Sequence, residues 1–337
     1  MNTRLTLLST VLALTAGAAS GAVAQAAADV PVDCNRACYE ALMDRYLDAV
    51  VAHDPSRLPF ASNVKYTEMG QRMDVGDGFW GVASGLGKYK QVFVDREGGQ
   101  VYYEGVMKEG KAAAPILMSI RLRVQAGKIS EVETIYYRKG NAPGWNDLGM
   151  DAMEKDPAPP APYQGFVPPA ERLSRAELLA VTAAYFAGVE KDDGKGYYPF
   201  TDDCNRRENG VSTTNAANMP PVDPGFNPMA MGCKAQFKLG WFSLVNDVHN
   251  RRLPLVDEEK QVVIGYAVFD MDSKGATVTE PSGKVITMAF GRPSSLQVAE
   301  AFRIKGPGPG NIQAIEAVVG TVLYHLNPVW TEGVVGK

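Results

Sequence analysis

The chain repeats its own pattern after roughly 140 residues, and this repeat limits the folds that it can adopt. A helix-like stretch, a Pro-Phe pair and a strand-like stretch follow one another in both halves. Tyr46 of the first half recurs as Tyr185. Glu68 recurs in the same way as Glu208. A period this long predicts two tandem domains rather than a solenoid, whose repeats have about 20–50 residues.

The first residues predict an export signal rather than a folded segment. Arg4 gives a charged start, an apolar run extends from Leu5 to Ala16, and the small residues 22–24 form a cleavage pattern. The run is shorter than the roughly 20 residues of a membrane-spanning helix. We therefore expect residues 1–24 to be a signal peptide of a periplasmic or extracellular protein that has no membrane partner.

The composition narrows the classes of partner. Hydrophobic residues make up 45% and charged residues 21% of the chain, which is typical of globular domains. The net charge of −4, without a basic run, argues against nucleic acid as a partner. No phosphate loop or nucleotide-binding glycine fingerprint is present, so we expect no cofactor. A small-molecule substrate or ligand is the partner that remains.

Four cysteines in an exported chain favour disulfide bonds. Of the three possible pairings, we expect Cys34–Cys38 and Cys204–Cys233. The second pair closes a loop of about 30 residues and is expected to stabilise the fold by roughly 3–4 kcal/mol. Zinc is the alternative, but a Cys-x-x-Cys pair and nearby histidines are missing, so we expect no metal.

Apolar periodicity predicts an α+β domain over residues 33–140. A helix is expected over 35–52, where apolar residues recur at helical spacing. The remaining elements are a strand at 64–69, a short helix near 87–94, and strands at 100–108, 114–124 and 128–138. The sheet is expected to curve around the long helix and to leave a cone-shaped pocket between them.

A proline-rich linker at 141–172 precedes the second domain, at 173–332. Ser174 and Glu177 have the spacing of a capping box, which predicts a helix that runs to about Lys191. Two long insertions, at 211–231 and 273–295, interrupt the domain, and strands are expected at 251–257, 262–270, 297–304 and 312–322.

The opening of each half resembles a known superfamily. Arg45 to Asp54, followed by Phe60 to Glu68, is similar to the start of the nuclear-transport-factor-like (SnoaL-like) superfamily, and ketosteroid isomerases share its order and spacing. The resemblance implies two tandem cone-like domains. It does not choose a function, because the superfamily includes isomerases, dehydratases, cyclases and binding modules.

The isomerase pattern implies three catalytic positions in the second domain. Glu208, eight residues after Phe200, takes the place of the base. Tyr185 takes the place of the tyrosine that donates to the reacting oxygen, and Glu300 that of the protonated carboxylic acid. A base, a hydroxyl and a neutral acid together suit removal of a proton beside a carbonyl group.

The first domain keeps only part of this pattern. Tyr46 and Glu68 correspond to the tyrosine and the base, and they are expected to contribute to binding. The third position falls near Ile120, which has no acidic group. We therefore expect catalysis in the second domain, with the first domain structural or completing a wall of the site.

Related dehydratases pair a helical Asp with a His, and Glu190 stands at that helical position. His249 is the expected partner. Arg252 is expected to bind a carboxylate or sugar hydroxyls, and Trp241 to line the mouth of the cone. A purely structural interpretation is also open for three of these residues: a solvated helix end for the glutamate, salt bridges for the arginine and core packing for the tryptophan.

Two functions from different classes remain open. The first is a secreted, cofactor-free isomerase or lyase that acts on a small organic substrate in the second cone. The second is a non-catalytic binding or assembly protein whose sheet faces form a homo-oligomer. Arg206 and Glu208 lie on the same face of one strand, so a structural ion pair is the alternative to a catalytic base.

Overall fold

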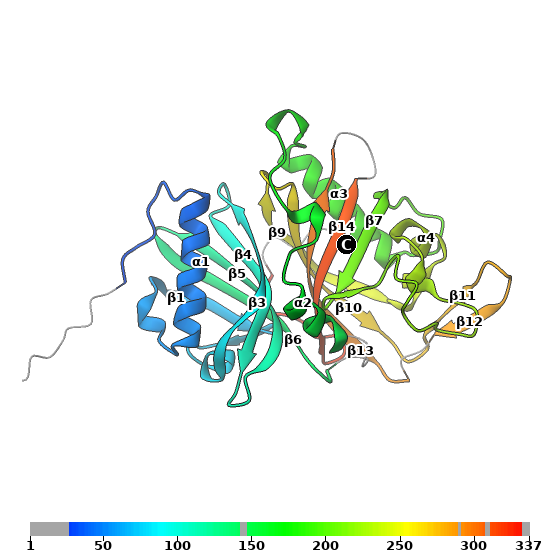
Figure 1. Ribbon diagram of the computed structural model, residues 1–337, viewed down its shortest axis with the longest axis horizontal. Helices are drawn as coiled ribbons and strands as arrows, with labels where there is room; N and C mark the ends of the chain where they lie inside the picture. Colours follow the sequence, from blue (N-terminus) through cyan, green and yellow to red (C-terminus); the bar gives the residue numbers. More distant parts are fainter. Residues whose placement is uncertain (1–26, 142–146, 289–290, 307–310, 332–337) are drawn as a thin grey trace, which may run out of the picture.

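The computed structural model describes residues 27–141, 147–288, 291–306 and 311–331. The expected signal peptide, residues 1–24, lies outside the described residues. The chain forms two α+β domains in tandem, each with one long helix and one six-stranded sheet (Figure 1).

Domain one contains a helix that packs in a curved sheet. Asn35 caps this helix by accepting a hydrogen bond from the Cys38 backbone N–H at 3.0 Å. The sheet has the strand order β2-β1-β6-β5-β4-β3, with only the β1–β6 pair parallel among its described pairs. The elements are α1 (Arg36–Val51), β1 (Phe60–Glu68), β2 (Gln71–Met73), β3 (Ala83–Asp95), β4 (Gln100–Glu109), β5 (Ala114–Gln125) and β6 (Lys128–Arg138).

Domain two repeats this topology strand for strand, in the order β8-β7-β14-β13-β10-β9. Its helix begins with the expected capping box of Ser174 and Glu177. The first insertion is longer than the expected 211–231, because it continues through α4 (Cys233–Lys238) as far as β9. The second insertion adds a separate hairpin, β11 (Ala276–Thr279) with β12 (Val285–Met288). The other elements are α3 (Arg175–Glu190), β7 (Phe200–Glu208), β8 (Val211–Ser212), β9 (Asp247–Asp257), β10 (Val262–Met271), β13 (Ser294–Ile304) and β14 (Ile312–Val322).

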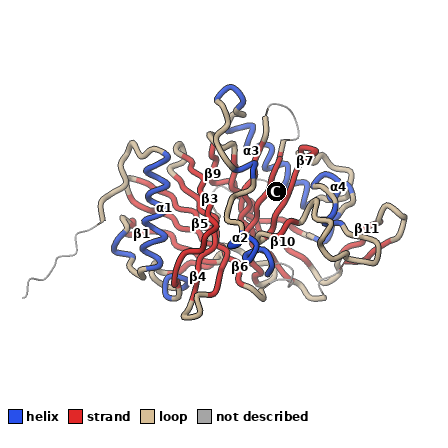
Figure 2. Tube along the Cα trace, viewed as in Figure 1, coloured by secondary structure: helices blue, strands red, loops and turns tan. Residues whose placement is uncertain are grey.

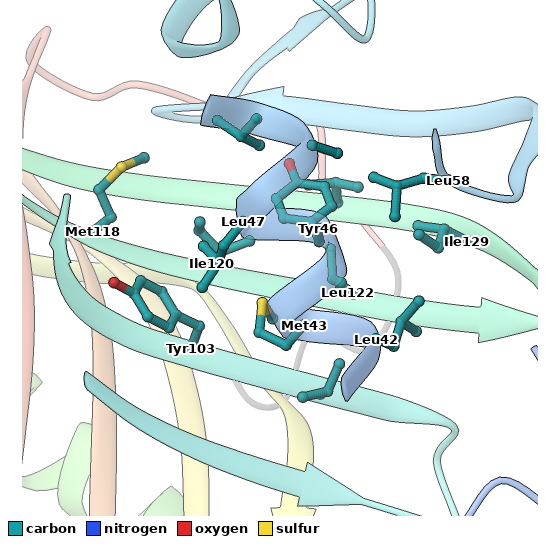
Figure 3. Packing of buried hydrophobic residues seen from close by; sticks show 14 of the residues in the cluster. Leu42, Met43, Tyr46, Leu47, Leu58, Tyr103, Met118, Ile120, Leu122 and Ile129 are labelled. Atoms are coloured by element: carbon teal, nitrogen blue, oxygen red, sulfur yellow. The ribbon is translucent and has the colours of Figure 1, made fainter. Parts of the chain in front are cut away.

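The core of each domain lies between its helix and its sheet. Figure 3 shows Met43, Tyr46 and Leu47 of α1 packed close to Ile120 and Leu122 of β5. All five are at most 2% exposed. Because these rings and aliphatic groups bury large apolar areas, they fix the helix against the sheet.

The two sheets also pack against each other through their other faces. Tyr102 and Ile135 of the first sheet share one buried cluster with Tyr266 and Val318 of the second. The molecule therefore has a helix, two sheets in its middle and a second helix. Figure 2 shows α1 at one side of the strands of the first sheet, with the strands of the second sheet beyond them. Sheet faces that were expected to join separate chains are thus buried within one chain. A homo-oligomer remains a prediction.

Buried charges cross this interface. Glu133 of β6 accepts hydrogen bonds from Arg252 of β9, one of them at 3.1 Å. Glu316 of β14 accepts one from Tyr89 of β3 at 2.9 Å and one from Gln91. Since breaking a buried ion pair leaves an uncompensated charge, these contacts hold the two domains in one arrangement.

One expected element is wrong. The segment 87–94 is not a short helix but part of strand β3. Its side chains alternate, with Tyr89 buried while Lys88 and Lys90 are exposed, which is the period of a strand. The linker region 141–172 also contains a helix, α2 (Asp147–Lys155).

Both expected disulfides are present. Cys34 is bonded to Cys38 and Cys204 to Cys233, and the described residues contain no free cysteine. This pairing is consistent with a secreted protein. Among the described helices, none has the length and apolar character that crossing a membrane requires.

Candidate functional site

Three of the residues singled out in the sequence meet in domain two. Glu208 of β7 pairs with Ala317 of β14, which pairs in turn with Glu300 of β13. Directly paired residues share a face of the sheet, so both glutamates face α3. Tyr185, from α3, donates a hydrogen bond to Glu300 Oε1 at 3.1 Å.

Burial favours the neutral form of the Glu300 carboxyl group. The residue is 3% exposed, and burial raises the pKa of its carboxyl group to about 8, with a further contribution from the charge of Glu208. The hydrogen bond from Tyr185 and the charge of Arg206 oppose this rise in pKa. Glu300 Oε2 is buried and has no hydrogen-bond partner among the residues that the structure describes. A protonated Oε2 is therefore a donor without an acceptor inside the described protein.

Aromatic rings surround Tyr185. Its ring lies 4.8 Å from that of Phe302, 5.8 Å from Phe237 and 6.1 Å from Phe200, between centroids. Burial raises the pKa of the Tyr185 hydroxyl well above its usual value, so the group is a donor rather than a phenolate. Tyr185 thus belongs to the buried cluster of domain two together with these rings.

Glu208 stands between solvent and this interior, with 27% of its side chain exposed. It accepts a hydrogen bond from Arg206 Nε at 2.8 Å and one from Thr213 Oγ1 at 3.2 Å. The structural ion pair that the spacing suggested is thus present. Arg206 also donates to Gln236 at 2.7 Å, and its guanidinium lies 4.7 Å from the ring of Phe242.

The first insertion covers this end of the cone. Gln236, on α4, donates to the backbone oxygen of Thr213 at 2.6 Å, and Phe237 packs on both Tyr198 and Phe200. The disulfide between Cys204 of β7 and Cys233 of α4 fastens the insertion to the sheet. The insertion therefore closes the cone above Tyr185.

The expected pair of Glu190 with His249 is wrong. Glu190 forms an ion pair with Arg251, whose guanidinium is long enough to reach back to α3. His249 lies near Asp270 instead, with its Nε2 3.4 Å from Asp270 Oδ1. The two side chains belong to different clusters.

Two expected ligand-binding residues are also used elsewhere. Arg252 is only 3% exposed and is held by Glu133 of domain one, so it is a buried salt bridge rather than a clamp for a ligand. Trp241 packs against Phe226 and the β11–β12 hairpin, not at the mouth of the cone. Both roles depend on contacts between segments far apart in the sequence.

The first cone holds a different arrangement. Glu68 of β1 accepts a hydrogen bond from the Phe79 backbone N–H at 2.7 Å and another from the Tyr66 hydroxyl. Burial raises the pKa of this carboxyl group. By strand pairing Glu68 lies beside Thr134, which lies beside Ile120, so the isoleucine occupies the position that Glu300 has in domain two.

Tyr46 does not contact Glu68 directly but packs edge-on against Trp80, 5.6 Å between centroids. Both rings line a narrow space that is too small to hold a water molecule. Tyr66 and Trp80 were not singled out in the sequence. The alternation of Tyr66 with Glu68 along one strand was the available signal for the first of them.

A family model matches residues 33–136 and 171–319, described as "Domain of unknown function (DUF8021)". The chain belongs to this family. The two matched segments coincide with the two domains, so the DUF8021 match supports the tandem organisation.

Other comparisons add little to the family assignment. No curated protein matches the chain. Among solved structures, AclR, "a putative hydroxylase from Streptomyces galilaeus", is similar, with 15% identity over 44% of this chain and 81% of that chain. Its TM-score is 0.28, so this likeness carries no argument about function.

Proposed function

We propose that domain two binds a small, largely apolar organic molecule that carries a carbonyl oxygen, and that it catalyses a cofactor-free isomerisation or dehydration. The proposal rests on the neutral acid of Glu300, whose Oε2 has no partner among the described residues and lies among aromatic rings. An acid kept protonated at a cost in desolvation is a candidate for function.

In the proposed reaction, Glu300 donates a hydrogen bond to the carbonyl oxygen of the substrate. Glu208 removes a proton from the carbon next to that carbonyl group, and the electron pair moves onto the oxygen. The hydrogen bond from Glu300 stabilises the negative charge that develops there. Return of the proton from Glu208 to another carbon completes an isomerisation. In a dehydration, the proton from Glu208 goes instead to a hydroxyl group on the neighbouring carbon, which leaves as water as the electron pair forms the new carbon–carbon double bond.

Two further residues support these roles. Tyr185 donates to Glu300 Oε1 and so directs Oε2 away from itself. Arg206 donates to Glu208 Oε1 at 2.8 Å and so orients the carboxyl group of the proposed base. The two carboxylate-bearing strand positions are two strand spacings apart, about 10 Å, which is room for one ring between the side chains. Glu190, paired with Arg251, is not part of this proposal.

The substrate needs the first insertion to move. Phe237 of α4 and Phe242 lie over the interior, so opening this segment exposes Glu300 and Arg206 together. The disulfide at Cys204 keeps the segment attached while it opens. A closed insertion in the free protein fits an enzyme that excludes water after binding.

The test is a screen of cyclic enones and small phenols by thermal shift, followed by turnover assays. Glu208→Gln is expected to retain binding and to lose turnover by about 10²–10⁴-fold. Glu300→Gln and Tyr185→Phe are expected to weaken phenol binding. Tyr46→Phe, the matched change in domain one, should alter neither property. If Tyr46→Phe has the same effect as Tyr185→Phe, or if no compound binds the parent protein, the proposal is wrong.

A second candidate function is a non-catalytic binding protein of the same fold. The observation that favours it is the ring packing around Tyr185, together with the pairing of Glu208 by Arg206. A compound that binds the parent and the Glu208→Gln variant equally, without turnover of either, would select this candidate.

We also propose that the protein is exported by its first 24 residues to the periplasm or the extracellular space, and that both domains belong to the nuclear-transport-factor-like superfamily. The two disulfides support the location. The repeated helix and curved sheet support the superfamily. Sequencing the N-terminus of the mature protein tests the first point.

A further inference from the structure

Two of the three histidines in the chain meet two aspartates at one edge of domain two. His249 and Asp247 lie at the start of β9, Asp270 lies near the end of β10, and His325 follows β14. One ligand atom from each of the four lies within 4.8 Å of the others. These four residues are called the His–Asp cluster below.

The strand register brings two like charges together. Asp247 is paired directly with Asp270 across β9 and β10. Directly opposed like charges destabilise a sheet, and a cation between them reverses the sign of the interaction. His249, two residues after Asp247, shares its face of the strand. No donor among the described residues forms a hydrogen bond with the Asp247 carboxylate.

The buried member of the cluster is held from behind. Asp270 is 1% exposed, and its Oδ1 accepts a hydrogen bond from Ser295 Oγ at 2.5 Å. Ser295 also accepts one from the His325 backbone N–H at 2.8 Å. Outer hydrogen bonds of this kind orient ligating side chains in metal sites.

His325 is placed by an unusual backbone conformation. Its φ is +58°, inside a turn in which Leu326 N–H donates to the Leu323 carbonyl oxygen. Glycine and asparagine are the usual residues at such a position. This turn brings His325 Nδ1 to 2.5 Å from Asp270 Oδ2, while 66% of the side chain stays exposed. The cluster is thus open to ions from solvent.

We propose that the His–Asp cluster binds a divalent first-row transition metal, with Zn²⁺ the best fit. Two imidazoles and two carboxylates form a donor set that suits zinc, whereas Mg²⁺ and Ca²⁺ prefer oxygen ligands alone. Tetrahedral zinc places its ligand atoms about 3.3 Å apart, and the four ligand atoms of the cluster lie within 4.8 Å of one another. The site differs from the expectation of no metal, which considered only the cysteines.

The metal has a structural role in this proposal. His325 lies near the start of the C-terminal segment 323–331, which crosses to domain one. There Trp330 Nε1 donates to Thr67 at 3.0 Å, and Lys65 donates to the Val329 carbonyl oxygen at 2.8 Å. Zinc therefore fastens this segment to β9 and β10. The inference does not depend on the proposed catalysis in the cone.

The test uses untagged protein and zinc alone, measured by equilibrium dialysis and by thermal melting. The parent is expected to bind one zinc per chain and to melt at a higher temperature with zinc. His325→Asn should bind zinc at least about 100-fold more weakly, and Ser295→Ala about 10-fold more weakly. Asn tolerates positive φ, so the first change removes the imidazole with little backbone strain.

The matched control is His53→Asn, because His53 also has a positive φ, +54°, and its side chain has the Trp80 carbonyl oxygen as its hydrogen-bond partner among the described residues. It should bind zinc like the parent. Asp247→Asn, a change of nearly equal volume, is a second variant in case His325→Asn fails to fold. The inference is overturned if the parent binds no stoichiometric zinc, or if Asp247→Asn binds zinc as tightly as the parent.

Discussion

The two domains share a topology but differ at one position of the sheet. Domain one has Ile120 where domain two has Glu300, and the strand pairing on either side is the same in both. Tyr46 and Tyr185 occupy matching places on the helices. Since the isoleucine needs only packing and the acid costs desolvation energy, the acid is the feature that packing does not explain.

The acids on the first strands differ as well. Glu68 in domain one is held by neutral donors, a tyrosine hydroxyl and a backbone N–H. Glu208 in domain two is held by the guanidinium of Arg206. The first is therefore a buried carboxyl group with a raised pKa, and the second a charged pair at the edge of solvent. One fold thus supports two electrostatic environments.

The largest expected effect concerns the pH dependence that Glu300 gives to stability. Between pH 4.5 and 8 the unfolded chain releases the proton while the folded chain keeps it, so the free energy of unfolding falls as pH rises. Glu300→Gln stays neutral and lacks this term. Relative to the parent it should gain about 4 kcal/mol from pH 4.5 to pH 8, measured by urea denaturation. If the difference in free energy of unfolding between parent and variant stays constant from pH 4.5 to pH 8, Glu300 is not a neutral buried acid, and it does not differ from Ile120 in the way proposed.

The two disulfides, one in each domain, should differ in how much they stabilise the fold. Replacing Cys204 and Cys233 by alanine opens a loop of 29 residues and should cost about 3.6 kcal/mol. Replacing Cys34 and Cys38 opens a loop of only 4 residues and should cost about 2 kcal/mol. Equal costs in denaturant would mean that the first insertion is not held by its disulfide.

The smallest single effect is expected among the partners of the first-strand acids. Arg206→Met leaves Glu208 without its cation and should cost about 3 kcal/mol. Tyr66→Phe removes one neutral hydrogen bond from Glu68 and should cost about 1 kcal/mol. Urea denaturation at pH 7 gives both values. The reverse order would contradict the difference that we draw between the two acids.

The sequence predicted much of this fold for local reasons. The capping box at Ser174 set the start of α3, and apolar periodicity set most strands within a few residues. The prediction of a helix at 87–94 was wrong because glycines and lysines obscured the alternation of the buried residues in this strand. The packing of the two sheets against each other was not predicted, because no local sequence pattern shows which face of a sheet will be covered by another domain.

In the candidate site, too, features set by local sequence were predicted and features set by distant contacts were not. Tyr185, Glu208 and Glu300 were predicted together because the repeat and the resemblance fixed their positions on each element, and the first and third are in contact. Arg252 was misjudged because its partner, Glu133, is 119 residues away in the other domain. The His–Asp cluster was missed because β10 and the segment after β14 meet β9 only in the folded chain.

The most direct test of this account is infrared spectroscopy of the carboxyl groups at pH 7. A protonated acid has a C=O stretch that a carboxylate lacks. The difference spectrum between the parent and Glu300→Gln should contain this band, and it should fade as pH rises through about 8. Absence of the band from the difference spectrum at pH 7 would mean that Glu300 is ionised, and the proposed donor in domain two would not exist.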